Sequence, residues 1–78
     1  PEVDDYDDFT IYPNPAAVGQ KITIDADLEI ERILVYNELG RLIMEPKIEA
    51  FTIDRPGLYV LDIQFETGTN HRGTFIVQ

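Results

Sequence analysis

The chain has 78 residues, of which 44% are apolar and 10% aromatic, which is enough for one small core. Fifteen acidic residues against six basic ones give a net charge of −9, which argues against binding to nucleic acid or directly to an anionic membrane surface. Cysteine, serine and tryptophan are absent and there is one histidine, which excludes disulfides, cysteine zinc sites and Ser–His or Cys–His nucleophile pairs. No apolar run is long enough to span a bilayer, and no signal peptide opens the sequence. We therefore expect a soluble, non-enzymatic module without cofactor or metal, taken from a longer chain.

The chain begins with an acidic segment. Residues 1–8 carry five of the fifteen acids, so the remaining ten acidic and six basic residues leave the body with a net charge of only −4. A block of like charges with only Val3 and Tyr6 to bury repels itself and stays solvated. We interpret residues 1–8 as the end of a linker and residues 9–78 as the domain. The alternative is a calcium loop, but the spacing lacks the glycine and the distal glutamate of an EF-hand.

Apolar residues recur with a period of two from Phe9 onward, which is typical of strands with one buried face. The predicted strands are 8–12, 20–28, 32–37, 41–45, 48–53, 57–66 and 71–77. The residues expected on their buried faces include Ile22, Ile24, Ala26, Leu28, Phe51, Ile53, Tyr59, Leu61, Ile63, Phe65, Phe75 and Val77.

The segment 32–37 is apolar on both faces, as a central or doubly covered strand is. Within residues 30–36 the spacing also fits a short helix, with Gly40 as its C-cap. We favour a strand, because β-branched residues are frequent and because Asn37-Glu38-Leu39-Gly40 has the residues of a type I hairpin turn followed by a glycine in the left-handed region.

The remaining turn residues agree with an all-β body. Arg55-Pro56-Gly57-Leu58 has proline and glycine where a type II turn needs them, and residues 66–70 form a polar loop of hairpin length. Pro13 and Pro15 each remove a main-chain donor, so the first strand must end there or lie at a sheet edge. Seven short strands with this turn spacing predict a small antiparallel β-sandwich.

Four blocks of the sequence carry a family resemblance. They are residues 9–16 (FTIYPNPA), residues 33–43 (ILVYNELGRLI), residues 56–63 (PGLYVLDI) and residues 73–77 (GTFIV). These blocks resemble, in order, the YPNP opening, the strand–turn–strand with its GR step, the GxYxxxI strand and the apolar last strand of type A C-terminal sorting domains. Such domains belong to the type IX (Por) secretion system of Bacteroidetes. The resemblance covers residues 9–78, about nine-tenths of the chain.

The resemblance implies a seven-stranded, Ig-like β-sandwich at the C-terminus of a larger cargo protein. Such domains pass through the periplasm, are recognised by the translocon at the outer membrane, and reach the cell surface or the medium. A surface sortase, a cysteine peptidase, then usually removes the domain and joins the cargo to anionic lipopolysaccharide. Cleavage is expected at or before Phe9, in a region that comprises Asp4, Asp5, Tyr6, Asp7 and Asp8.

Two departures from the family pattern admit a variant role. Thr74 stands where the family commonly has a lysine, with Arg72 two residues earlier, and the chain ends in Gln78 in place of a basic residue. The variant is a sorting-type domain that is retained and serves as a docking or lipopolysaccharide-binding module of the secretion machinery.

The recognition candidates are Pro13, Asn14, Pro15, Gly40, Arg41, Gly57 and Tyr59. Each also has a structural interpretation: the glycines serve turns, Tyr59 belongs to the core face of its strand, and Arg41 is a solvated hairpin residue. The prolines either shape an edge for recognition by strand addition or protect that edge against aggregation, and the sequence leaves this choice open.

Two other function classes compete with a sorting domain. One is a carbohydrate- or protein-binding β-sandwich module of an extracellular enzyme, which requires that Tyr6, Tyr12 and Tyr36 share a face, since no tryptophan is present. The other is a small hydrolase that uses two carboxylates, for which the chain lacks partner residues and the length to form a cleft.

Overall fold

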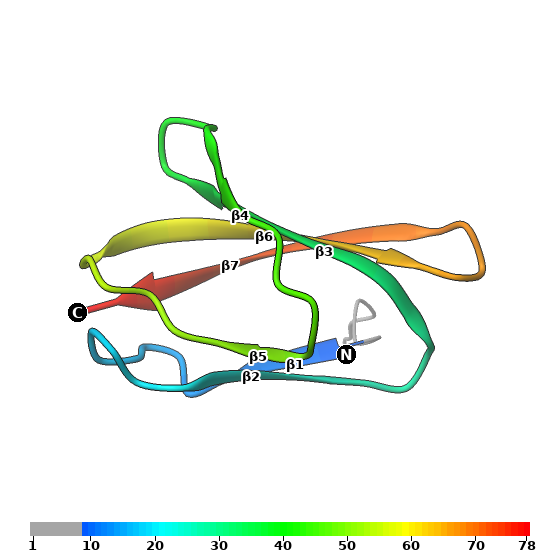
Figure 1. The fold of residues 1–78 in the computed structure, drawn as a ribbon, viewed down its shortest axis with the longest axis horizontal. Helices are drawn as coiled ribbons and strands as arrows, with labels where there is room; N and C mark the ends of the chain where they lie inside the picture. The colour runs from blue at the N-terminus through cyan, green and yellow to red at the C-terminus, as the bar shows by residue number, and fades with distance from the viewer. Residues whose placement is uncertain (1–8) are drawn as a thin grey trace, which may run out of the picture.

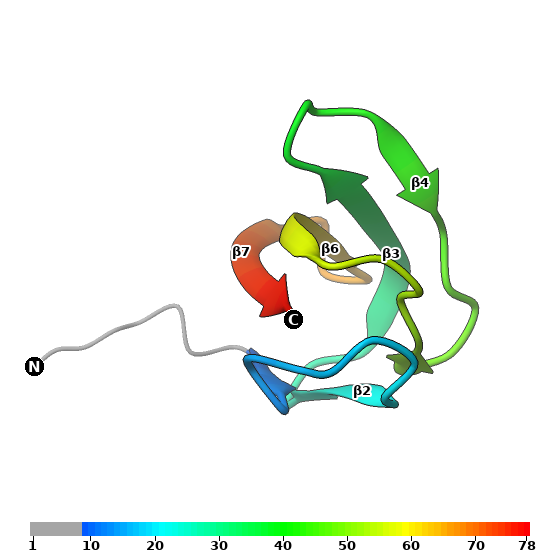
Figure 2. The same cartoon turned by 90° about the vertical axis from the view of Figure 1, so that its left-hand side faces the viewer.

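The computed structural model describes residues 9–78 as strands and connecting loops. The strands form a three-stranded sheet in the order β1-β2-β5 and a four-stranded sheet in the order β4-β3-β6-β7, and every pairing within them is antiparallel. The two sheets face each other across the core (Figures 1 and 2). The all-β prediction with seven strands is confirmed, whereas the predicted linker, residues 1–8, lies outside the described residues. The strands are β1 Phe9–Tyr12, β2 Ile22–Ala26, β3 Ile30–Asn37, β4 Leu42–Met44, β5 Ala50–Phe51, β6 Gly57–Phe65 and β7 Asn70–Val77.

The core lies between the sheets and follows the predicted alternation. Burial of these side chains is the main stabilising term for a domain of this size, at about 25 cal/mol per Å² of apolar surface removed from water. Phe75 is central to it, because its ring stacks on Tyr59 at 5.5 Å and meets Phe51 edge-on at 5.9 Å. The buried cluster comprises Ala16, Ile22, Ile24, Ile33, Val35, Ile53, Tyr59, Leu61, Ile63, Phe65, Phe75 and Val77.

Two predicted strands, 20–28 and 48–53, are markedly shorter in the structure. Leu28, expected on the buried face, is 39% exposed because β2 ends at Ala26. Its last residue, Ala26, pairs with Phe9 of β1, the first residue that the structure describes. The segment predicted as strand 48–53 forms only the two-residue β5, which pairs with Ile22 and Thr23 of β2, and the Ile24 N–H donates to the Glu49 carbonyl beside it.

Strand β3 occupies a central position, as its apolar sequence predicted. It lies between β4 and β6, and residues 30–36, for which a helix was the alternative, belong to the strand. Ile33 and Val35 point into the core between the sheets. Leu34 points to the other side of the sheet, beside Asp62 of β6, and is only 6% exposed.

The hairpin turn between β3 and β4 has the predicted geometry. Gly40 donates its N–H to the Asn37 carbonyl at 2.9 Å and has φ +82, the left-handed region that glycine adopts without strain. The Asn37 side chain fixes the loop, since its Oδ1 accepts from the N–H groups of Leu39 and Arg41, each at 3.0 Å. The pairing of β3 with β4 shifts register between Val35 and Tyr36, just before the turn, so a bulge lies beside it.

The turn before β6 differs from the prediction. A type II turn needs Gly57 at φ near +80, but Gly57 has φ +155 and is already the first residue of β6. The Arg55 carbonyl accepts a hydrogen bond from the Tyr59 hydroxyl at 2.8 Å. A core side chain therefore positions this bend, which the local sequence does not reveal.

Candidate recognition surface

The segment from Pro13 to Ala16 carries the chain from one sheet to the other. It leaves β1 of the three-stranded sheet and reaches the end of β7, where Ala16 forms a parallel bridge with Val77. The Asn14 Oδ1 accepts from the Ile76 N–H at 3.0 Å, and the Ala16 N–H donates to the Ile76 carbonyl at 2.9 Å. The polar groups of this segment thus cover the edge of β7 along its last residues.

Gly40 and Arg41 lie in the β3–β4 hairpin, which projects away from the body of the molecule (Figure 1). No heavy atom lies within 4 Å of the position that a Cβ at Gly40 would occupy, so glycine is required there by its φ and not by space. The main chain of Arg41 is held by Asn37, to which its carbonyl and its N–H are both bonded. Its side chain is exposed, as expected.

Gly57 and Tyr59 lie at the start of β6. Tyr59 is a core residue, as its strand position predicted, and its hydroxyl is satisfied by the Arg55 carbonyl. Gly57 lies beside the same ring, because a Cβ there would be 3.6 Å from the Tyr59 Cε2. Gly57 pairs with Val77, which in turn pairs with Ala16, so this glycine and the 13–16 segment flank the end of β7 from both sides.

One cavity joins two of the candidates. It has a volume of about 340 Å³ and lies between the β3–β4 hairpin and the 53–55 segment. Arg41 and Tyr59 line it, whereas Pro13, Asn14 and Pro15 do not. The full lining is Asn37, Arg41, Ile43, Met44, Ile53, Asp54, Arg55 and Tyr59.

Arg55 is a cationic residue of this cavity that is not among the candidates predicted from the sequence. It is placed there by the bend before β6, and the sequence gives no sign that this bend faces the β3–β4 hairpin. Neither Arg55 nor Arg41 forms an ion pair with another residue in the range 9–78. Two guanidinium groups therefore border one cavity in a domain whose described residues sum to a charge of −4.

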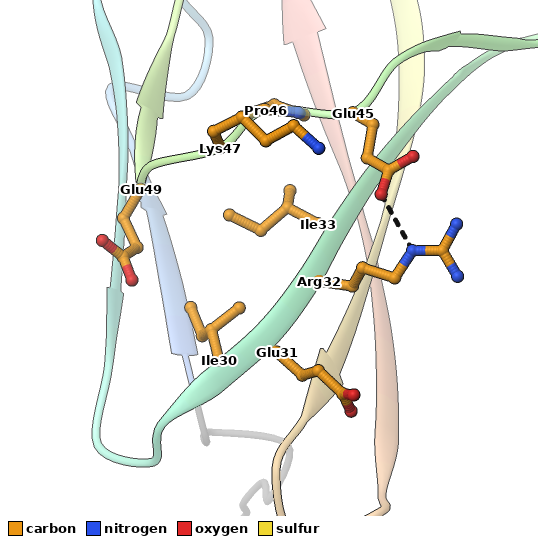
Figure 3. Close-up of a pocket in the computed structure, with 8 residues that line it drawn as sticks. All are labelled: Ile30, Glu31, Arg32, Ile33, Glu45, Pro46, Lys47 and Glu49. Atoms are coloured by element: carbon orange, nitrogen blue, oxygen red, sulfur yellow. Dashed lines mark hydrogen bonds and ion pairs between the residues drawn. The ribbon is translucent and has the colours of Figure 1, made fainter.

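A second, smaller cavity of about 140 Å³ lies where β3 begins and the chain leaves β4 (Figure 3). The Arg32 Nε donates to the Glu45 Oε2 at 2.9 Å, and this bond holds the pKa of the Glu45 carboxyl below its ordinary value and raises the pKa of Arg32. The carboxylates of Glu31 and Glu49 point away from one another. No group of three or more metal-ligating side chains occurs among the residues that the structure describes.

Arg72 lies on β7. It is two residues before Thr74, the position where the family commonly has a lysine. Its Nη2 is 3.5 Å from the Oδ2 of Asp62, a mostly buried carboxylate on the neighbouring strand. The predicted cleavage region, Asp4 to Asp8, lies outside the described residues.

Comparison with known families identifies the family of the chain. The family model described as a secretion system C-terminal sorting domain matches residues 10–78. The chain belongs to this family. Searches of curated proteins and of solved structures returned no match.

Membership confirms the resemblance drawn from the four sequence blocks. The chain is a type IX secretion sorting domain, and it acts by interaction with the type IX machinery, which directs export toward the outer membrane or the cell surface. The matched range spans all seven strands, apart from Phe9 at the start of β1. Residues 9–78 contain no helix with the length and apolar content needed to cross a membrane.

Proposed function

We propose that this sorting domain is an Ig-like β-sandwich that serves as the address label of an upstream cargo protein and performs no chemistry of its own. The translocon binds it at the periplasmic side of the outer membrane. A surface sortase then cleaves within residues 4–8 and joins the cargo to anionic lipopolysaccharide. The observation that carries the proposal is the family match over residues 10–78 of a chain whose strands form one continuous core.

The geometry of the described residues supports a non-catalytic role. Their cavities are small and open, and the acidic residues of the smaller one point in different directions (Figure 3). A carbohydrate-binding module is less well supported, because Tyr12 lies on β1 and Tyr36 on β3, in different sheets. These two rings do not form one aromatic platform.

A retained variant of the same domain is the second candidate. The observation in its favour is the absence of the family's usual basic residues at Thr74 and Gln78, together with the engagement of Arg72 by Asp62. In this variant the domain stays attached and docks other components of the secretion machinery or lipopolysaccharide.

The test is a secreted reporter fused to residues 1–78 and expressed in a Bacteroidetes host, with the reporter alone as control. We expect the fusion at the cell surface and the control in the periplasm, with the domain removed within residues 4–8 as read by mass spectrometry. A reporter that stays in the periplasm in both strains contradicts the proposal. A surface reporter with the domain still attached favours the retained variant.

A further inference from the structure

The strand edges on the two sides of the sandwich are covered to different degrees. On the side of β1 and β7, the 14–18 segment bonds the end of β7, and Phe9 packs over Gly73, where a Cβ would lie 3.3 Å from the Phe9 Cζ. On the opposite side, β4 is the last strand of its sheet, and its outer edge forms no main-chain hydrogen bond to any other described segment. The edge of β4 is therefore open.

Strand β4 carries no charged residue and no proline on its open edge. Natural edge strands prevent pairing with another chain through charges, prolines, inward-facing polar groups, shortness or bulges, and β4, with three residues and one bulge, uses the last two. The three residues of β4 are Leu42, Ile43 and Met44, none of them charged. Ile43 is the extra residue of the bulge, since Val35 pairs with Met44 and Tyr36 with Leu42, and its side chain is 41% exposed.

The larger cavity lies directly beside this edge. Ile43 and Met44 form one wall, and the buried core residues Ile53 and Tyr59 also line it. Its volume of about 340 Å³ is sufficient for one large apolar side chain. A peptide strand paired with β4 presents alternate side chains to the same face, so one of them can enter the cavity.

The charge of the cavity selects an acidic partner. Arg41 and Arg55 border it from the hairpin and from the 53–55 segment, and Asp54 is the one carboxylate in the lining, which leaves a local charge of +1 in a body of −4. Neither arginine has an ion-pair partner within residues 9–78. A guanidinium group binds a carboxylate through two parallel hydrogen bonds, which gives both affinity and orientation.

The geometry points to a docking site for an extended acidic peptide of another protein. Its main chain adds a short strand to β4, an apolar side chain fills the cavity between Ile43 and Tyr59, and a carboxylate two residues further along, on the same face of the peptide strand, meets Arg41 and Arg55. A small anion alone does not use the open main-chain groups of β4, whereas a peptide uses the edge, the cavity and the charge together. This inference holds for the folded domain whether or not the export function proposed above is correct.

The experiment is an NMR titration of the isotope-labelled 78-residue chain with a capped nonapeptide in which valine and aspartate alternate along one strand face and threonine occupies the other. We expect amide shift changes centred on residues 41–44 and 53–55. Two peptide controls are matched in length: one carries asparagine in place of aspartate, and one is N-methylated at alternate positions and so cannot pair as a strand. Each is expected to bind about tenfold more weakly, a change that corresponds to one lost charged pair or to lost main-chain pairing.

Two double variants test the site on the protein side. Arg41→Glu with Arg55→Glu is expected to weaken binding of the aspartate peptide about tenfold or more. Lys21→Glu with Lys47→Glu changes the net charge equally at cations outside the cavity and is expected to bind like the parent chain. Thermal melts of both variants establish that they are folded.

Several results overturn the proposal. The first is the absence of binding at millimolar peptide. The second is equal binding of the N-methylated peptide, which indicates a simple anion site. The third is an equal loss of peptide affinity in the two double variants, which indicates a general charge effect. Shifts at residues 41–44 that grow with protein concentration before peptide is added also overturn it, because the occupant is then a second copy of the chain.

Discussion

The contact between Asn14 and Ile76 gives the sharpest test of the structure, because it joins residues 62 positions apart with a single side-chain hydrogen bond. The perturbation is Asn14→Ala, which removes the Oδ1 acceptor and leaves the Ala16 bonds to β7 in place. Ile76 is partly exposed, so water can solvate its freed N–H. The expected loss is therefore that of one ordinary hydrogen bond, about 0.5–1.5 kcal/mol.

For a domain of this size, a loss of this magnitude lowers Tm by about 2–12 °C. We expect urea unfolding to show a lower midpoint with an unchanged m-value, since the buried surface stays the same. Hydrogen exchange at the Ile76 amide is expected to become faster. Asn14→Asp keeps an acceptor at the same position and is expected to retain most of the stability at neutral pH.

The matched control is Asn70→Ala. Asn70 also lies on β7, is exposed, and its side chain forms no hydrogen bond within residues 9–78. Its truncation is therefore expected to change stability by less than about 0.5 kcal/mol. Equal stability of Asn14→Ala and the parent chain, with unchanged exchange at Ile76, refutes the assigned contact.

The same variants separate a structural role of Asn14 from a role in recognition. If Asn14 serves to close the edge of β7, Asn14→Asp folds and is exported like the parent chain. If the translocon contacts the asparagine amide itself, Asn14→Asp folds but the fused reporter stays in the periplasm. Melting curves and reporter localisation, measured on the same variant, decide between the two roles.

Three further predictions concern local features. Asn37→Ala removes the acceptor of two hairpin N–H groups and is expected to lower the free energy of unfolding in urea by about 1–2 kcal/mol, whereas Asn37→Asp keeps the acceptor and is expected to retain the stability. Gly57→Val forces a β-branched residue to φ +155 and is expected to cost about 1–3 kcal/mol, so an unchanged melting curve contradicts the assigned conformation. The pKa of the Glu45 carboxyl, followed by NMR, lies below the ordinary glutamate value and rises toward it in Arg32→Gln, which removes the hydrogen bond. Because that folded-state pKa is lowered, the stabilisation from the pair is present above the ordinary glutamate pKa and is lost as the pH falls through the lowered value; a Glu45 titration that Arg32→Gln leaves unchanged contradicts the bond.

The strands and two hairpins were predictable because their determinants are local. Alternation of apolar residues requires only neighbours two positions apart, and the Asn37–Gly40 turn is built from groups within four residues of one another. The same holds for the loop after Phe65, where Gly68 has φ +95 and bonds back to the Phe65 carbonyl.

The features that sequence reasoning missed depend on partners far away in the chain. The extent of β5 depends on where it meets β2, and the Tyr59 ring, whose hydroxyl bonds the Arg55 carbonyl, stacks on Phe75 of β7. The cavity joins Arg41 to Arg55 only because the β3–β4 hairpin faces the segment before β6. The resemblance of the sequence blocks predicted the family, but it carries no information on which of their residues share a surface.

The most direct test of the central claim, that this domain is a type IX sorting signal, is the surface-exposed fraction of the fused reporter in two otherwise identical hosts. One host has a functional type IX translocon and the other lacks it. We predict a surface-exposed reporter in the first host and a periplasmic one in the second. Equal surface exposure in both hosts contradicts the claim.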